Sequence, residues 1–240
     1  MLSRWMLNSD VSDMGDYFVR ELSFLVPSHN DDKEEEIVTL KIHQKIKGTV
    51  ASVVWDSALV ACKYVEQQNL ASPDLYKGKK VLDLGAGTGI CSLWMAALGA
   101  DVTVTDLSEE LGLIRTNINA NSKVISGGHI SVEPLDWSDG EAIKRFQQYG
   151  FDIILAIDCL YYEASLGPLV ATLSGVATDT TDILFVYEKR DEGKPKWVQQ
   201  QFFELAKDHF RIENVPRSQL HSDYASDDIP VHLMRKLHQG

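Results

Sequence analysis

Residues 81–90 read VLDLGAGTGI, an apolar run that ends in three glycines at alternate positions, Gly85, Gly87 and Gly89. The apolar residues are typical of a buried strand, and the segment that starts at Ile90 repeats its apolar side chains at helical spacing. A strand that turns directly into a helix through glycines brings backbone N–H groups close to a ligand. The stretch therefore predicts the start of a Rossmann-like α/β fold with a cofactor at the turn.

A carboxylate follows the next predicted strand. Residues 101–105 are β-prone and are followed by Asp106, which lies 23 positions after Asp83. A β–α–β unit places an acid near this position against the hydroxyls of a ribose. We therefore expect Asp106 to bind the ribose of a nucleoside cofactor.

The glycine spacing and the local charge bear on which cofactor binds. The dinucleotide fingerprint requires a sixth-position glycine, where this chain has Ile90. The carboxylates of Asp83 and Asp106 would repel a pyrophosphate, whereas S-adenosylmethionine carries a sulfonium and an ammonium. The pattern favours S-adenosylmethionine and methyl transfer, with NAD and a glycine turn that binds nothing as the alternatives.

The composition limits the class of protein and its partners. The chain has 240 residues, 44% of them hydrophobic, and a formal net charge of −12. Such a charge disfavours nucleic acid and suits a lysine-bearing substrate, although solubility alone would also explain it. The three cysteines lack a C-x-x-C pair, and no apolar run reaches 18 residues. We expect a cytoplasmic or nuclear monomer without bound metal or membrane segment.

The order of predicted elements gives the domain organisation. Residues 17–26 and 37–42 are β-prone and flank the acidic run 30–36, which predicts a hairpin within an N-terminal extension, residues 1–47. Residues 48–240 alternate strands and helices, and two strands, 210–215 and 231–237, then follow without a helix between them. We predict a parallel sheet with helices on both faces and an antiparallel last strand.

Aromatic and acidic residues at strand ends are further candidates for the site. Trp55 precedes a predicted helix, and Asp136 and Trp137 follow a short strand. An indole face and a carboxylate match an adenine, although the usual place of a tryptophan is the core. The strongly apolar strand 151–157 ends in Asp158 and Cys159. Asp158 could instead cap a helix, and a nucleophilic Cys159 lacks the accompanying His–Asp pattern.

These motifs together resemble the family-16 protein lysine methyltransferases, a branch of the seven-strand methyltransferases. The narrower resemblance lies in VWDSA at residues 54–58 and DCLYYE at residues 158–163. YEKR at residues 187–190 and YASDDIPVH at residues 224–232 are similar to the members that methylate a hexameric AAA ATPase. The resemblance implies a seven-strand methyltransferase fold and a protein-lysine N-methyltransferase with a AAA ATPase as its protein substrate.

The resemblance also implies roles for individual residues. Asp158 and Tyr161 fall on the D-x-x-Y positions that line the lysine channel, and we predict that they orient the acceptor amine. The positions that contact S-adenosylmethionine in the family are Trp55, Gly85, Ala86, Gly87, Asp106, Trp137 and Ile157. Two alternatives remain: a methyltransferase for another acceptor, such as an Hsp70-type chaperone, and a non-catalytic cofactor-binding partner.

Overall fold

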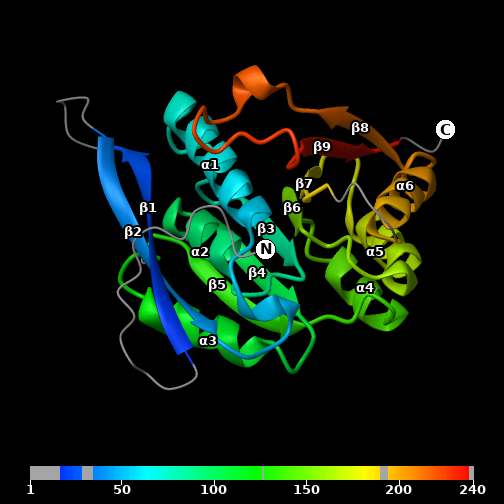
Figure 1. Ribbon diagram of the computed structural model, residues 1–240, viewed down its shortest axis with the longest axis horizontal. Helices are drawn as coiled ribbons and strands as arrows, with labels where there is room; N and C mark the ends of the chain where they lie inside the picture. Colours follow the sequence, from blue (N-terminus) through cyan, green and yellow to red (C-terminus); the bar gives the residue numbers. More distant parts are fainter. Residues whose placement is uncertain (1–16, 29–34, 126, 190–193, 238–240) are drawn as a thin grey trace.

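A seven-stranded sheet forms the centre of the protein (Figure 1). The computed structural model describes residues 17–28, 35–125, 127–189 and 194–237. The sheet order is β5-β4-β3-β6-β7-β9-β8. Its strands are β3 (Lys80–Leu84), β4 (Asp101–Asp106), β5 (His129–Pro134), β6 (Ile153–Ile157), β7 (Asp182–Val186), β8 (Phe210–Asn214) and β9 (Val231–Lys236). β9 runs antiparallel to both β7 and β8, so the prediction of an antiparallel last strand is confirmed.

Helices cover both faces of this sheet, as the sequence predicted (Figure 1). One face carries α1 (Asp56–Ala71), α2 (Ile90–Ala97) and α3 (Leu111–Ala120), and the other carries α4 (Gly140–Gln147), α5 (Leu166–Val176) and α6 (Lys194–Ala206). Each face has its own large buried apolar cluster. The sequence analysis did not predict α4, a short helix in a polar segment, which starts where the Asp139 side chain accepts hydrogen bonds from the N–H groups of Glu141 and Ala142.

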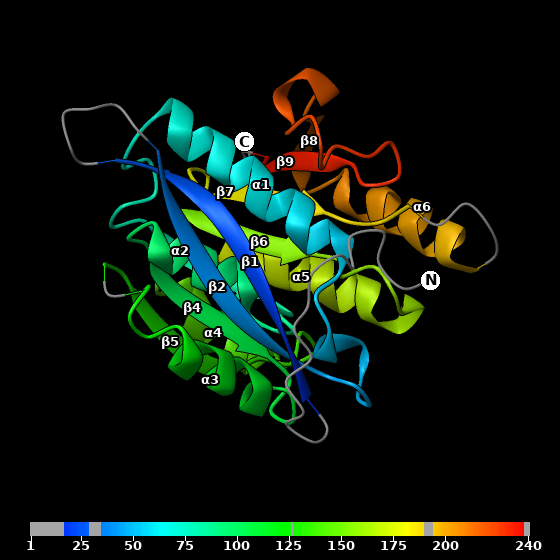
Figure 2. The ribbon, with the colours of Figure 1, turned by 60° about the vertical axis from the view of Figure 1, so that its left-hand side comes forward.

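The predicted hairpin is present as a separate two-stranded sheet, β1 (Tyr17–Pro27) and β2 (Glu35–Lys45). It crosses the helices of the first face (Figure 2). Phe24 of β1 stacks on Trp94 of α2 with ring centroids 4.5 Å apart, and Leu40 and Ile42 of β2 are fully buried. The hairpin therefore shares one apolar core with α1 and α2. The division at residue 47 remains a prediction, and the expectations for residues 1–15 and 30–34 lie largely outside the described residues.

Three parallel strands bring the predicted site residues to one edge of the sheet. β3 leads into Gly85, β4 ends at Asp106, and β6 leads into Asp158. The register of β3 with β4 and β6 aligns these carboxyl ends. Since open α/β sheets bind ligands outside the carboxyl ends of their strands, this edge is the place to look for the site.

Candidate active site

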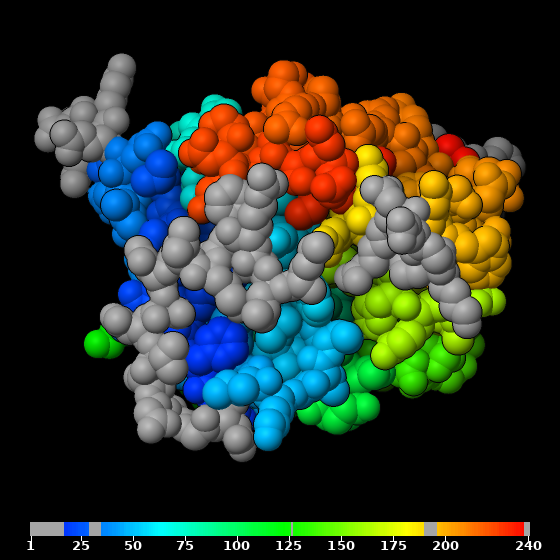
Figure 3. Space-filling model, in the orientation of Figure 1, coloured from blue at the N-terminus to red at the C-terminus, as the bar shows by residue number. Residues whose placement is uncertain are grey.

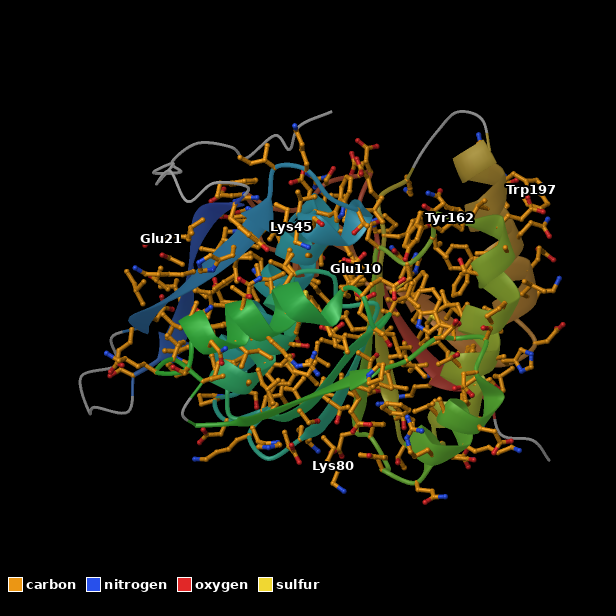
Figure 4. All side chains as sticks on the ribbon, turned by 90° about the horizontal axis from the view of Figure 1, so that it is seen from below. Glu21, Lys45, Lys80, Glu110, Tyr162 and Trp197 are labelled. Atoms are coloured by element: carbon orange, nitrogen blue, oxygen red, sulfur yellow. The ribbon has the colours of Figure 1, made fainter. Side chains whose placement is uncertain are left out.

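A cavity of about 220 Å³ opens at the carboxyl ends of β3, β4 and β6. Figure 4 labels Glu110, which comes just before α3, and Tyr162, which belongs to the segment after β6. The cavity has three walls: the glycine loop, the strap before α1 (residues 50–55), and the turn after β6. Its lining residues are Val50, Ala51, Val53, Val54, Trp55, Ala58, Asp83, Gly85, Ala86, Gly87, Thr88, Ile90, Cys91, Asp106, Ile157, Asp158, Leu160 and Tyr161.

The three glycines of the loop adopt left-handed backbone conformations, with φ values of 62°, 57° and 77° for Gly85, Gly87 and Gly89. Side chains at such φ values are strained, which is why glycine occupies them. A Cβ on Gly87 would lie 3.2 Å from the carbonyl oxygen of Ala51, so the loop also approaches the strap closely. Gly89 is the N-cap of α2 and does not line the cavity.

Asp106 organises the glycine loop as well as lining the cavity. Its two carboxylate oxygens accept hydrogen bonds from the N–H groups of Gly87 and Leu107, each at 2.8 Å. Burial raises the pKa of the Asp106 carboxyl, while these two hydrogen bonds oppose the rise. A carboxylate oxygen can accept more than one hydrogen bond, so the same group can also receive a ribose hydroxyl.

Asp83 is almost fully buried, with 2% of its surface exposed. The Ser92 hydroxyl donates a hydrogen bond to its carboxylate at 2.7 Å, and Thr105 Oγ1 donates to its backbone carbonyl. Burial raises the pKa of Asp83 to about 7; the Ser92 bond opposes this rise and the nearby Asp106 adds to it. Asp83 is therefore a lining carboxyl group that changes charge near neutral pH.

The strap is fixed by hydrogen bonds at both of its ends. The indole Nε1 of Trp55 donates to the carbonyl of Val50 at 2.8 Å, which closes the short 3₁₀ helix η1 (Val50–Ser52) onto the start of α1. The N–H of Val54 donates to Oε1 of the buried Gln44 at 2.7 Å. Trp55 is the N-cap residue of α1, the helix that the sequence predicted directly after it.

Asp158 begins the turn after β6 in an unusual conformation. Its φ of 57° is left-handed, which a non-glycine residue adopts at a cost of about 1–3 kcal/mol. Its N–H donates to the carbonyl of Val186 at 2.7 Å, so β7 holds the chain in this turn. The N–H of Glu188 donates to the Asp158 carboxylate at 3.4 Å. The turn places Asp158 and Tyr161 in one cavity wall. Their role in holding the acceptor lysine remains a prediction.

Two tyrosines follow Asp158, and only the first of them lines the cavity. Tyr161 lines it, and Tyr162 packs edge-on against the Tyr161 ring at 4.8 Å. Both are exposed, at 44% for Tyr161 and 62% for Tyr162. Burial of its phenol oxygen, followed by the neighbouring Cys159 and acidic groups, raises the pKa of Tyr161. The phenol therefore stays neutral and can donate a hydrogen bond at physiological pH.

Asp136 and Trp137 are not among the residues that line the cavity. The Asp136 carboxylate accepts hydrogen bonds from the N–H and hydroxyl of Ser138, which stabilise the turn after β5. The Trp137 ring lies against Gly85, where an added Cβ would be 3.0 Å from the indole. Trp137 therefore packs on the glycine loop and Asp136 stabilises the turn after β5, while the contact of either residue with an adenine remains a prediction.

Cys159 is buried and does not line the cavity. Its Sγ donates to the carbonyl of Leu84 at 3.3 Å, and burial raises the pKa of the thiol. A buried thiol with a raised pKa is a poor nucleophile, so the structure disfavours that alternative for Cys159.

Sequence reasoning missed several lining or supporting residues. Val50, Ala51 and Val53 reach the cavity through the strap, and no local motif indicates that this segment folds across the glycine loop. Ser92 could have been found, because it lies in the first turn of the predicted helix, where a hydroxyl can reach back to Asp83.

The donor set of the cavity suits a cation. Asp83, Asp106 and Asp158 supply three carboxyl groups, and neither lysine nor arginine is among the described lining residues. A pyrophosphate would be repelled here, whereas a sulfonium and an ammonium would be attracted. The described residues contain no cluster of His, Cys, Asp or Glu that could hold a metal ion. They also contain no helix long and apolar enough to cross a bilayer.

The fold of this protein is that of the class I methyltransferases. Solved structures of this class share the fold: a Thermus thermophilus 16S rRNA methyltransferase, RsmC, superposes with a TM-score of 0.55 and 16% identity, over 90% of this chain and 51% of that chain. A putative methyltransferase, SMU.776, crystallised with SAH, gives a TM-score of 0.54 and 15% identity over 90% and 56% of the two chains.

Sequence comparison narrows the class to a family. A model described as "Lysine methyltransferase" matches residues 34–209, and the chain therefore belongs to this lysine methyltransferase family. METTL21A of Danio rerio is 37% identical over 60% of this chain and 64% of that protein, and METTL21A of Xenopus tropicalis is 30% identical over 95% and 93%. EEF1A lysine methyltransferase 3 of Mus musculus is 33% identical over 79% and 73%. The predicted reaction, S-adenosylmethionine-dependent methylation of protein lysine, is confirmed at the level of the family.

Proposed function

We propose that this enzyme methylates a lysine of a AAA ATPase of the valosin-containing protein type. The observation that carries the proposal is one continuous cavity that joins the glycine loop to Asp158 and Tyr161. When bound, S-adenosylmethionine supplies an electrophilic methyl group and a positive charge that disfavours protonation of a nearby amine. Asp83, Asp106 and the loop glycines hold this cofactor, and Asp158 and Tyr161 hold the acceptor.

The Asp158 carboxylate orients the lysine amine. A free lysine has a pKa near 10.4, so losing the proton at about pH 7.4 costs roughly 4 kcal/mol. A neighbouring carboxylate stabilises the ammonium and therefore does not lower this cost. Asp158 and Tyr161 instead align the nitrogen lone pair by hydrogen bonds, and alignment of two reactants can supply several kcal/mol.

The tail segments that resemble the enzymes acting on AAA ATPases support the choice of acceptor. The N–H of Lys189 donates to the carbonyl of Asp228 at 2.6 Å, and its ammonium donates to the carbonyl of Asp227. These bonds join segment 187–190 to segment 224–232. Arg190, the last residue of the first segment, lies outside the described residues. Glu188, next to Lys189, contacts Asp158. The first segment thus reaches the wall residue Asp158 through Glu188, and the second segment is bonded to the first. Figure 3 shows the C-terminal part of the chain, in orange and red, at the surface.

A second candidate acceptor is a translation elongation factor. The name of the Mus musculus relative, EEF1A lysine methyltransferase 3, favours this alternative. Both acceptors require the same lysine chemistry, and both agree with the cytoplasmic location that we propose.

Transfer of a radiolabelled methyl group to purified acceptors tests the proposal. We expect label on the AAA ATPase, mapped to one lysine by peptide analysis, and no label with the Asp158→Ala variant. If label appears instead on the elongation factor or on an Hsp70-type chaperone, the proposed acceptor is wrong and the proposed lysine methylation stands. If no protein in a cell lysate is labelled while S-adenosylmethionine still binds, the non-catalytic alternative holds.

A further inference from the structure

Strand β2 of the hairpin is linked to two walls of the cofactor cavity through consecutive residues. The backbone of His43 is linked to the glycine loop by Asn117 of α3. The side chain of Gln44, the next residue, is bonded directly to the strap at Val54. Neither Asn117 nor Gln44 lines the cavity.

Asn117 is completely buried, and its amide makes three hydrogen bonds. Oδ1 accepts from the N–H of His43 at 2.7 Å, and Nδ2 donates to the carbonyls of His43 at 3.1 Å and Thr88 at 2.9 Å. Thr88 lies between Gly87 and Gly89, so the third bond restrains the peptide in the middle of the glycine loop. Loss of the Asn117 amide would leave the buried Thr88 carbonyl without this hydrogen bond, unless the loop moves.

Gln44 performs the corresponding role for the strap. Its Oε1 accepts the N–H of Val54 at 2.7 Å, and both residues are buried. Val54 lines the cavity together with Ala51, whose carbonyl lies close to Gly87 of the glycine loop. A displacement of the strap would therefore change the distance between the two walls.

We propose that β2 braces the cofactor cavity, and that Asn117 and Gln44 are positioning residues for S-adenosylmethionine binding. The N-terminal hairpin is then part of the cofactor site. A cavity held in its binding conformation before the ligand arrives avoids the free-energy cost of ordering loops on binding. This inference goes beyond the proposed function, since it does not depend on which protein is the acceptor.

The chain supplies a matched control in Asn121, one turn further along. Asn121 is also buried, and its amide also makes three hydrogen bonds: with the N–H and the carbonyl of Lys41 in β2, and with the carbonyl of Asn117. Asn117→Ala and Asn121→Ala therefore remove the same atoms and two equivalent bonds to β2. They differ in the third bond, which reaches the glycine loop only from Asn117.

Calorimetric titration with S-adenosylmethionine compares the two variants with the unmodified enzyme, and thermal unfolding is measured alongside. We expect both variants to lose similar stability, while the Kd rises about 10-fold for Asn117→Ala and less than 2-fold for Asn121→Ala. With any acceptor that is methylated, KM for the cofactor should rise for Asn117→Ala and kcat at saturating cofactor should stay within 2-fold. Equal changes of Kd in the two variants would overturn the role of Asn117.

Gln44→Met provides the second test, because it keeps the length of the side chain and removes the acceptor for Val54. We expect a several-fold higher Kd for S-adenosylmethionine. If Asn117→Ala does not fold, this variant decides whether β2 braces the cavity. An unchanged Kd in a folded Gln44→Met variant would overturn the brace.

Discussion

The two halves of the cavity are built by different means. On the cofactor side, backbone groups dominate: left-handed glycines, N–H groups bonded to Asp106, and the buried Asp83 held by Ser92. On the acceptor side, one left-handed non-glycine residue, Asp158, introduces the exposed rings of Tyr161 and Tyr162.

This difference teaches which half can vary. A buried, hydrogen-bonded backbone site tolerates little change, because each altered group leaves an unsatisfied partner. Exposed side chains on a turn can change at low cost to stability, and loops on a rigid scaffold are where proteins alter specificity. We therefore expect cofactor binding to be sensitive to the fold and acceptor choice to be sensitive to single side chains.

The largest expected effect separates the two halves completely. Asp158→Ala should lower turnover by about 100-fold or more, roughly 2.7 kcal/mol, because the amine loses its orienting carboxylate. Cofactor affinity, measured by calorimetry, should change far less than turnover, because Asp83 and Asp106 remain in the cavity. Asp158→Asn is the control for the backbone, since asparagine tolerates a left-handed φ. If turnover falls only in proportion to cofactor affinity, Asp158 belongs to the cofactor half of the cavity and not to the acceptor half.

A pair of glycine variants sharpens the description of the cofactor half. Gly87→Ala should weaken cofactor binding by about 2 kcal/mol. The loop can relieve the cost of a left-handed alanine, about 1–2 kcal/mol, and the contact of its Cβ, 3.2 Å from the Ala51 carbonyl, only by leaving its binding conformation. Gly78→Ala is the matched control, with φ of 70° and nothing within 4 Å of its added Cβ. Calorimetry should show weaker binding for Gly87→Ala alone, and equal binding in the two variants would contradict the crowding at the strap.

The pH dependence of cofactor binding probes Asp83, which faces Ser92 and lies near Asp106, Cys91 and Cys159. With a pKa of about 7, its ionised fraction rises about 10-fold between pH 6 and pH 8, and an anion attracts the cationic cofactor. Affinity should therefore increase by up to about 10-fold, or 1.4 kcal/mol, over this range. Calorimetry on Asp83→Asn should show a flatter profile, and an identical profile would exclude Asp83 as the titrating group.

The same pKa shift has the opposite sign for folding. The folded pKa of about 7 lies above the value of 3.8 for a free aspartate side chain, so folding favours the protonated group. The contribution of Asp83 to stability is therefore fully present below about pH 4 and is lost as the pH rises through 7.

The smallest expected effect lies on the acceptor side. Tyr161→Phe removes one hydrogen-bond donor and keeps the ring that packs against Tyr162, so turnover should fall by about 1 kcal/mol, roughly fivefold. Steady-state kinetics should show this loss without a change of KM for S-adenosylmethionine. A loss as large as that of Asp158→Ala would mean that the phenol does more than align the amine.

The sequence alone determined the scaffold and the local motifs. Alternating apolar runs predicted the sheet and the hairpin, and the glycines with Asp83 and Asp106 predicted the cofactor loop. These features could be predicted because each depends on residues that are neighbours in the chain, where periodicity and turn chemistry act. The short helix α4 was missed because its pattern covers only two turns within a polar segment.

Only the tertiary structure decided which residues meet across the cavity. The strap reaches Gly87, and Asn117 joins β2 to Thr88 across 29 and 74 positions of the chain. It also packed Trp137 on Gly85 and left Asp136 and Trp137 out of the cavity lining, so their contact with the cofactor stays a prediction. Such contacts depend on how the hairpin packs on α1–α3, and buried side chains of widely separated residues determine that packing.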